Sequence, residues 1–197
     1  MVRPGRAGTD EPMWFITDFA DQAVILPVAL ALAVSLWRGG WMKGARTWVL
    51  CCGATLGGLG AAKLAVFAFG PFSLLPLLDS PSGHTASSAI TWGGLAVLLL
   101  PRTRRLPLGL PIAAAITALI GATRLGLHVH TMPDVIIGAA IGLTGTLALA
   151  LALDDPPPGL RRSLLLGPAF LIAAALHGYR LPAEPLLRTI GAALRLS

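Results

Sequence analysis

Six apolar segments, separated by short polar connections, occupy most of this chain. A helix that crosses a bilayer needs about 20 apolar residues, and its backbone polar groups must be hydrogen-bonded within the segment. Of the 197 residues, 55% are hydrophobic and 12% are charged, and the mean hydropathy is +0.75. A soluble domain of this length has too little interior to bury so much apolar surface. We therefore expect an all-α membrane bundle of about six transmembrane helices in a single domain over residues 1–197, with spans near 22–37, 46–68, 84–100, 106–123, 134–153 and 163–178.

Both ends of the chain are expected to lie at the membrane surface. Residues 1–21 combine a polar start with Trp14 and Phe15 beside acidic residues, which is typical of an interfacial segment rather than a signal peptide. Residues 180–197 place leucines against arginines, which indicates an amphipathic helix on the outer surface. Small residues are frequent within the spans, so the helices are expected to pack closely.

Basic residues between the apolar segments indicate how the bundle is oriented. Most of them follow the first, third and fifth spans: Arg38, Lys43, Arg46, Arg102, Arg104, Arg105, Arg161 and Arg162. The positive-inside rule places these connections in the cytoplasm, and the other connections and both termini outside. A membrane rim of this kind accounts for the net charge of +6, so no nucleic-acid partner is expected. The adjacent Cys51 and Cys52 lie in an apolar segment and are expected to be packing residues.

Three polar islands border the apolar segments on the face predicted to be external. They contain Lys63, the run Pro81-Ser82-Gly83-His84, and the stretch that holds Arg124, His130 and Asp134. Ionisable groups at membrane depth are costly, so their presence there predicts a functional site. The free N–H groups where a helix opens after Ser82 suit an anion, and Gly83 allows its close approach.

The side chains of these islands suit a phosphate ester. Lys63 and Arg124 supply positive charge, and an arginine can bind two phosphate oxygens at once. Asp134 follows His130 by four residues, so its carboxylate can hold one ring nitrogen and leave the other as a nucleophile. His84 can then protonate the leaving oxygen. The islands therefore predict one phosphate-binding pocket at a membrane face.

These blocks resemble the type-2 phosphatidic acid phosphatase superfamily of membrane lipid phosphatases. The family pattern is a Lys ahead of Arg-Pro, then Pro-Ser-Gly-His, then Ser-Arg followed by His and Asp. The second block is complete here at residues 81–84. The third block and the run after it match at Arg124, His130, Asp134, Val135 and Gly138, with Thr123 where the family has Ser.

The first block of the pattern is incomplete in this chain. Lys63 is followed by Gly70-Pro71 where the family has Arg-Pro, so one cation of the family's site is missing. We considered Arg180, a basic residue predicted on the same membrane face, as a substitute for it. Its removal would then slow hydrolysis.

The resemblance implies a metal-independent phosphoric-ester hydrolase that needs no cofactor. His130 would attack phosphorus and form a phosphohistidine, Asp134 would orient His130, and His84 would act as the acid for the leaving group. The phosphoryl oxygens would be bound by Lys63, Ser82, Gly83, Arg124 and, by the hypothesis above, Arg180. His128, His177 and Asp79 fall outside the pattern and are expected to have structural or interfacial roles.

The resemblance also implies a class of substrate. Its members suggest phosphatidic acid, phosphatidylglycerol phosphate, isoprenyl phosphates such as undecaprenyl pyrophosphate, or lipid A phosphates, hydrolysed at the outer leaflet. Short loops favour a bacterial inner membrane, with the site facing the periplasm or exterior. Two alternatives remain open from the residues alone: a lipid-linked phosphotransferase, and a degenerate bundle that binds lipid phosphate without catalysis.

Overall fold

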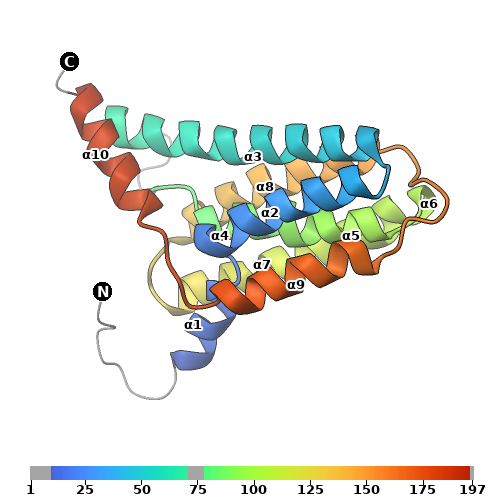
Figure 1. The fold of residues 1–197 in the computed structure, drawn as a ribbon. Helices are drawn as coiled ribbons and strands as arrows, with labels where there is room; N and C mark the ends of the chain where they lie inside the picture. Colours follow the sequence, from blue (N-terminus) through green and yellow to red (C-terminus); the bar gives the residue numbers. More distant parts are fainter. Residues whose placement is uncertain (1–9, 71–77, 196–197) are drawn as a thin grey trace.

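The computed structural model describes residues 10–70 and 78–195, and every regular element in these residues is a helix (Figure 1). The all-α class is therefore confirmed. In chain order the helices are α1 (Glu11–Asp18), α2 (Gln22–Arg38), α3 (Met42–Phe69), α4 (Gly83–Ser88), η1 (Ala89–Gly93), α5 (Gly94–Leu99), α6 (Arg102–Arg104), η2 (Arg105–Gly109), α7 (Leu110–Gly126), α8 (Met132–Ala152), α9 (Ser163–Leu176) and α10 (Ala183–Arg195).

Four helical stretches among the described residues are long and apolar enough to cross a membrane: Glu11–Arg38, Met42–Phe69, Arg102–Gly126 and Met132–Ala152. The chain is thus an integral membrane protein. Helix α9 is apolar but has only 14 residues, and the third predicted span is the continuous run α4–η1–α5. The count of six transmembrane helices therefore stays a prediction.

The long helices run along a common direction, and the α4–η1–α5 run packs among α3, α7 and α8 (Figure 1). This run is central because its side chains are small or apolar; Ala86, Ala89 and Ile90 are fully buried. A π-helical turn at η1 widens the middle of the run. Helix α8 approaches it closely, since Gly142 leaves room for the backbone of α4.

Replacing Gly142 with alanine is expected to lower stability by about 1–3 kcal/mol, because overpacking displaces well-packed neighbours. A Cβ there would lie 2.5 Å from the Ala86 carbonyl oxygen and 2.6 Å from the Ala89 Cβ. The measurement is the thermal unfolding midpoint of the purified protein in detergent. Gly57→Ala is the control, because Gly57 is exposed on α3 and a Cβ there meets nothing within 4 Å. Equal midpoints for the two variants would contradict the packing argument.

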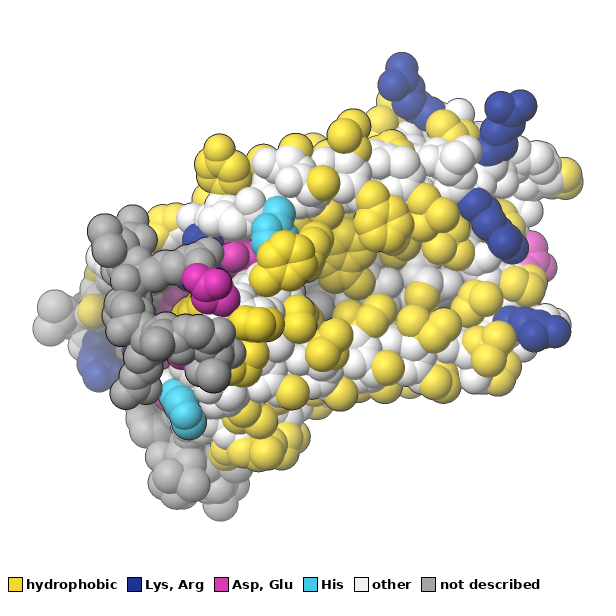
Figure 2. Space-filling view, turned by 90° about the horizontal axis from the view of Figure 1, so that it is seen from below, with side chains coloured by type: hydrophobic (Ala, Val, Ile, Leu, Met, Phe, Trp, Pro, Cys, Tyr) yellow, Lys and Arg dark blue, Asp and Glu magenta, His cyan; other side chains and the backbone are white. Residues whose placement is uncertain are grey.

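One end of the bundle carries most of the basic residues that were expected at a cytoplasmic rim. Figure 2 shows Lys and Arg side chains at that end and hydrophobic side chains along the flank. Arg105 differs from the others, because its side chain is fully buried. It donates hydrogen bonds to the carbonyl oxygens of Leu100, Leu153 and Asp154. Besides the position at the cytoplasmic rim that the sequence predicts for it, Arg105 therefore ties α5 to the end of α8.

The terminal segments differ in part from the sequence expectation. Residues 1–9 and 196–197 lie outside the described residues. In the predicted interfacial stretch, Asp18 and Asp21 are buried rather than exposed at a surface. The predicted amphipathic tail does form a helix, α10, but it packs across the end of α3. The Arg195 side chain donates to the carbonyl oxygens of Phe67 and Ala68, which fixes α10 there.

Candidate active site

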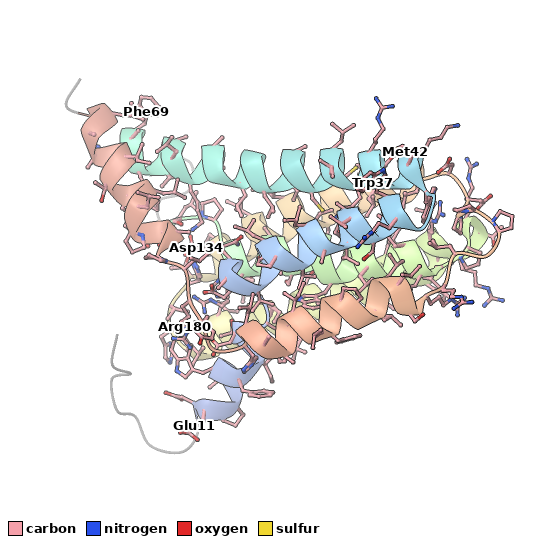
Figure 3. The ribbon with its side chains drawn as sticks, in the orientation of Figure 1. Glu11, Trp37, Met42, Phe69, Asp134 and Arg180 are labelled. Carbon is pink, nitrogen blue, oxygen red and sulfur yellow. The ribbon has the colours of Figure 1, made fainter. Side chains whose placement is uncertain are left out.

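A cavity of about 750 Å³ opens at the end of the bundle opposite the basic rim. Figure 3 shows Asp134 and Arg180 at this end, whereas Trp37 and Met42 lie at the other. The three polar islands, far apart in sequence, meet here. The charged, imidazole and glycine residues on the cavity wall are Asp21, Lys63, Gly60, Gly83, His84, Arg124, His130, Glu184 and Arg188.

The turn before α8 holds His130 in one orientation. Thr131 is the N-cap of α8, and its hydroxyl accepts from the Asp134 N–H while the Asp134 carboxylate accepts from the Thr131 N–H at 2.9 Å. This capping box places the carboxylate beside His130, where Asp134 Oδ2 lies 3.3 Å from His130 Nδ1. Asp134 itself is fully buried behind the cavity wall. With Nδ1 on the carboxylate, the other ring nitrogen of His130, Nε2, keeps its lone pair.

Asp134 also joins two of the sequence blocks. Its Oδ1 accepts from the backbone N–H groups of Asp79 at 3.1 Å and Ser80 at 3.0 Å. The Ser82 N–H donates to the Asp134 carbonyl oxygen at 2.9 Å. Gly138, one turn further along α8, permits this contact because a Cβ there would lie 2.5 Å from the Ser82 carbonyl oxygen. The carboxylate therefore positions the start of α4 as well as the imidazole.

The start of α4 brings Gly83 and His84 to the cavity, but Ser82 lies behind it. Ser82 is fully buried as the N-cap of α4, and its Oγ accepts from the Thr85 hydroxyl at 2.8 Å and the Thr85 N–H at 3.4 Å. Its place among the phosphate-binding residues stays a prediction that the geometry does not favour. His84 Nε2 lies 3.7 Å from Asp21 Oδ2. Asp21, the N-cap of α2, was not singled out from the sequence because an acidic residue before an apolar segment has no distinctive signal.

Two cations of the sequence pattern reach the cavity from different helices, α3 and α7. Lys63 is 5% exposed, and its ammonium donates to Ser80 Oγ at 2.6 Å and Glu184 Oε2 at 2.8 Å. Arg124, at the end of α7, donates from Nη1 to the Thr17 hydroxyl at 3.4 Å. Its Nε is buried without a hydrogen-bond partner among the described residues. An unpaired buried donor is costly unless a ligand completes it, so Arg124 is suited to bind an anion.

The third cation on the cavity wall is Arg188, not Arg180. Arg180 donates from Nε and Nη2 to Asp18 Oδ1 at 3.0 and 2.8 Å, and its guanidinium lies 4.3 Å from the centre of the Trp14 ring. Arg180 does not line the cavity. Glu184 and Arg188 do, and sequence reasoning missed both. Their spacing of four residues on one polar face of the predicted tail helix was the available signal.

The electrostatics of the cavity favour a neutral His130. Burial lowers the pKa of His130, and the nearby positive charges of Arg124 and Lys63 lower it further, while the hydrogen bond to Asp134 acts in the opposite direction. At neutral pH the imidazole is therefore unprotonated. Burial acts to raise the pKa of Glu184, but the contacts with the Lys63 ammonium and the Arg188 guanidinium, together with nearby His130, outweigh it and hold that pKa below its usual value. Among the described residues, no group of three His, Cys, Asp or Glu side chains is placed to hold a metal ion.

The fold and this cavity define a helical integral membrane protein with a histidine site lined by cations at one end. A family model described as the PAP2 superfamily matches residues 23–156, and the chain belongs to that superfamily. The resemblance noted from the three blocks is thus confirmed. The superfamily includes phosphatases that act on lipid phosphates, so membership supports a phosphatase at that coarse level.

A curated relative extends the likeness over most of the chain. It is described as an uncharacterized 22.5 kDa protein in the cps region of Klebsiella pneumoniae. The two are 33% identical over 190 residues, which cover 91% of this chain and 90% of the relative. No solved structure matches the chain.

Proposed function

We propose that this protein is a metal-independent phosphatase that removes a phosphate from the phosphomonoester or pyrophosphate head group of a membrane lipid, through a phosphohistidine on His130. One observation carries the proposal. His130 is held through Nδ1 by the buried Asp134, and it lines the same cavity as His84, Lys63 and Arg124. A nucleophile, an acid and two cations at one cavity are the groups that phosphoryl transfer requires.

The proposed reaction has two steps. The Nε2 lone pair of His130 forms a bond to phosphorus as the bond from phosphorus to the lipid oxygen breaks, and the imidazolium form of His84 gives its proton to that oxygen. A water molecule then gives a proton to His84, and its oxygen bonds to phosphorus as the P–N bond breaks. Inorganic phosphate leaves, and both imidazoles return to their starting states. The Asp134 carboxylate stabilises the charge that develops on His130 in each step.

The cations act on the phosphoryl oxygens, over which the negative charge of the transition state is spread. Lys63 and Arg124 are fixed by their other contacts, so little reorganisation is needed when that charge develops. The backbone of Gly83 lies on the same wall, with the Lys63 side chain at 3.6 Å from the place a Cβ would take. We assign phosphate binding to these residues, and Ser82 to the support of the α4 start.

The remainder of the cavity supports a lipid as the substrate. Its apolar wall comes from α2, α3 and α10, through Leu26, Leu56, Leu59 and Leu187. An acyl or isoprenyl chain can lie against these side chains while its head group meets the cations. The cavity lies at the opposite end of the bundle from the basic connections that contain Arg38, Lys43 and Arg102, which supports an active site at the outer leaflet of a bacterial inner membrane.

The test is phosphate release by the purified protein from a panel of lipid phosphates and pyrophosphates, with chelator present. Release that requires His130 supports the proposal. Product that forms only when an acceptor alcohol is added would replace it with phosphotransfer. Binding of the lipids with no release from any of them would replace it with a non-catalytic role. The panel includes phosphatidic acid, phosphatidylglycerol phosphate and undecaprenyl pyrophosphate, so it also ranks the substrates.

The acid limb of the pH profile is expected to lie below the usual histidine pKa of about 6.5. Only the neutral imidazole of His130 is nucleophilic, and its lowered pKa keeps it neutral until the pH falls below that value. Activity should therefore be retained as the pH falls from 7 to about 6.5, and be lost below it. The measurement is kcat/KM against pH, corrected for the ionisation of the substrate phosphate as followed by phosphorus NMR. A limb that begins above 6.5 after this correction would contradict the expectation.

A further inference from the structure

The position at which the first sequence block lacks its arginine is unsuited to a side chain. Gly70 ends α3 with φ of +83°, a conformation that L residues rarely adopt. A Cβ there meets no neighbour, so the constraint comes from the backbone rather than from space. If the cavity uses a third cation for the phosphoryl group, it must come from another element.

Arg188 of α10 reaches the cavity wall from the C-terminal part of the chain. Its Nη2 lies 2.9 Å from Glu184 Oε1 and 2.9 Å from Asp79 Oδ2, and its guanidinium lies 4.5 Å from the centre of the Phe67 ring. Its side chain is 46% exposed, so it is accessible from the open side of the cavity. These contacts hold the guanidinium on the Glu184 carboxylate, which also binds Lys63.

Glu184 bridges the two cations. Its Oε2 accepts from Lys63 and its Oε1 from Arg188, so one oxygen of the carboxylate is bound to each cation. Two oxygens of a phosphoryl group can accept from the same pair of donors, because Lys and Arg side chains form charge-assisted hydrogen bonds with carboxylate and phosphate oxygens alike. Glu184 thus occupies the place that a tetrahedral dianion would take between Lys63 and Arg188.

We propose that Arg188 is a further substrate-binding residue, supplied by α10 in place of the arginine missing at Gly70, and that Glu184 holds Lys63 and Arg188 until phosphoryl oxygens displace it. This inference rests on the proposed function for the identity of the substrate. It makes the C-terminal helix part of the active site rather than a surface anchor. The phosphoryl group would then be bound by cations from α3, α7 and α10.

A purely structural role for the Glu184–Arg188 pair is the competing explanation. The docking of α10 has separate supports, however. Arg195 caps the carbonyl groups at the end of α3, and Gly191 lies directly against Phe67, where a Cβ would be 2.5 Å from the Phe67 Cβ. Arg195 is therefore the matched control: it belongs to the same helix, carries the same charge and does not line the cavity.

The experiment measures the affinity of the purified full-length protein in detergent for inorganic phosphate, by titration calorimetry. Arg188→Gln is expected to weaken binding about 10-fold or more, the loss of one charge-assisted contact. Arg188→Lys keeps the positive charge but loses the planar set of guanidinium N–H donors, so this variant should bind phosphate with intermediate affinity. Arg195→Gln should stay within about twofold of the wild type, since it leaves the cavity intact. Glu184→Gln should bind phosphate more tightly than the wild type, because a competing anion is gone.

Weaker phosphate binding by Arg188→Gln together with tighter binding by Glu184→Gln would support the inference. If the pair were purely structural, removing either partner would break the same contact, and both variants would change the phosphate affinity in the same direction. Weaker binding by Glu184→Gln, unchanged binding by Arg188→Gln, or an equal loss in Arg195→Gln would each overturn it. Thermal unfolding without phosphate verifies that each variant is folded. Phosphate binding needs no turnover, so a protein that binds phosphate through Arg188 yet hydrolyses no lipid would overturn the proposed function and leave this inference standing.

Discussion

Replacing His130 with alanine is expected to abolish phosphate release, with kcat lowered by about 10⁴- to 10⁶-fold, as is found when a covalent nucleophile is removed. Of the two imidazoles on the cavity wall, only His130 is hydrogen-bonded to a buried carboxylate among the described residues, since His84 Nε2 lies 3.7 Å from Asp21 Oδ2. Without that imidazole the P–N bond cannot form, and only the bound cations remain to assist water. The measurement is the single-turnover rate on the best substrate of the lipid panel.

His128→Asn is the matched control for this prediction. His128 is exposed, belongs to the same loop and does not line the cavity. Its φ of 54° is in the left-handed region, which asparagine tolerates, so this exchange keeps the backbone of the loop. The control should retain nearly full activity. Phosphate release by His130→Ala at more than a hundredth of the wild-type rate would rule out the phosphohistidine.

Replacing Asp134 with asparagine is expected to lower kcat by about 10⁴-fold, as in other hydrolases whose histidine loses its carboxylate. The amide no longer stabilises the positive charge on His130, and it can favour the wrong tautomer. The same change should lower stability by about 1–3 kcal/mol, because the carboxylate accepts from three backbone N–H groups and an amide nitrogen cannot accept. Asp134 therefore links catalysis to the fold.

Two measurements separate these effects of Asp134→Asn. Thermal unfolding in detergent reports the stability, and single-turnover rates at a temperature where the variant is folded report the chemistry. Asp155→Asn is the control, because Asp155 is exposed at the opposite end of the bundle. A variant that loses stability but keeps its rate would show that Asp134 only supports the loop. A variant that loses the rate with unchanged stability would contradict the role of the three N–H contacts.

Much of the helical layout could be predicted from hydropathy. The span expected at residues 22–37 is the helix Gln22–Arg38, and the one expected at 163–178 is Ser163–Leu176. Apolar length determines such segments, because backbone groups in lipid must be bonded within their own helix. Lys63 lies near the end of the second predicted span, and His130 follows the fourth. The second and fourth connections lie on the same side of the membrane, so both residues are expected at one end of the bundle. Helix counting alone predicted this convergence, and the cavity contains both residues.

The roles of individual arginines could not be predicted in this way. Arg105 and Arg104 are neighbours in one basic cluster, yet Arg105 is buried among backbone carbonyl groups and Arg104 is exposed. Arg180 and Arg188 both follow the last apolar segment, yet only Arg188 lines the cavity. The rotation of a helix about its axis decides that Arg105 faces inward and Arg104 outward, and neighbouring helices determine that rotation through packing. Arg180 lies in the connection before α10 and Arg188 lies on that helix, so the docking of α10 decides which of the two reaches the cavity.

By itself the sequence determined the class of fold through its hydropathy, and the end of the bundle that carries the site through the order of the spans. It also determined the pairing of His130 with Asp134 through their spacing of four residues. Only the tertiary structure decided that Asp134 also anchors the backbone of Ser80, and that α10 brings Glu184 and Arg188 to Lys63. Those contacts join residues far apart in the chain. They depend on where each helix packs, which no local pattern of residues encodes.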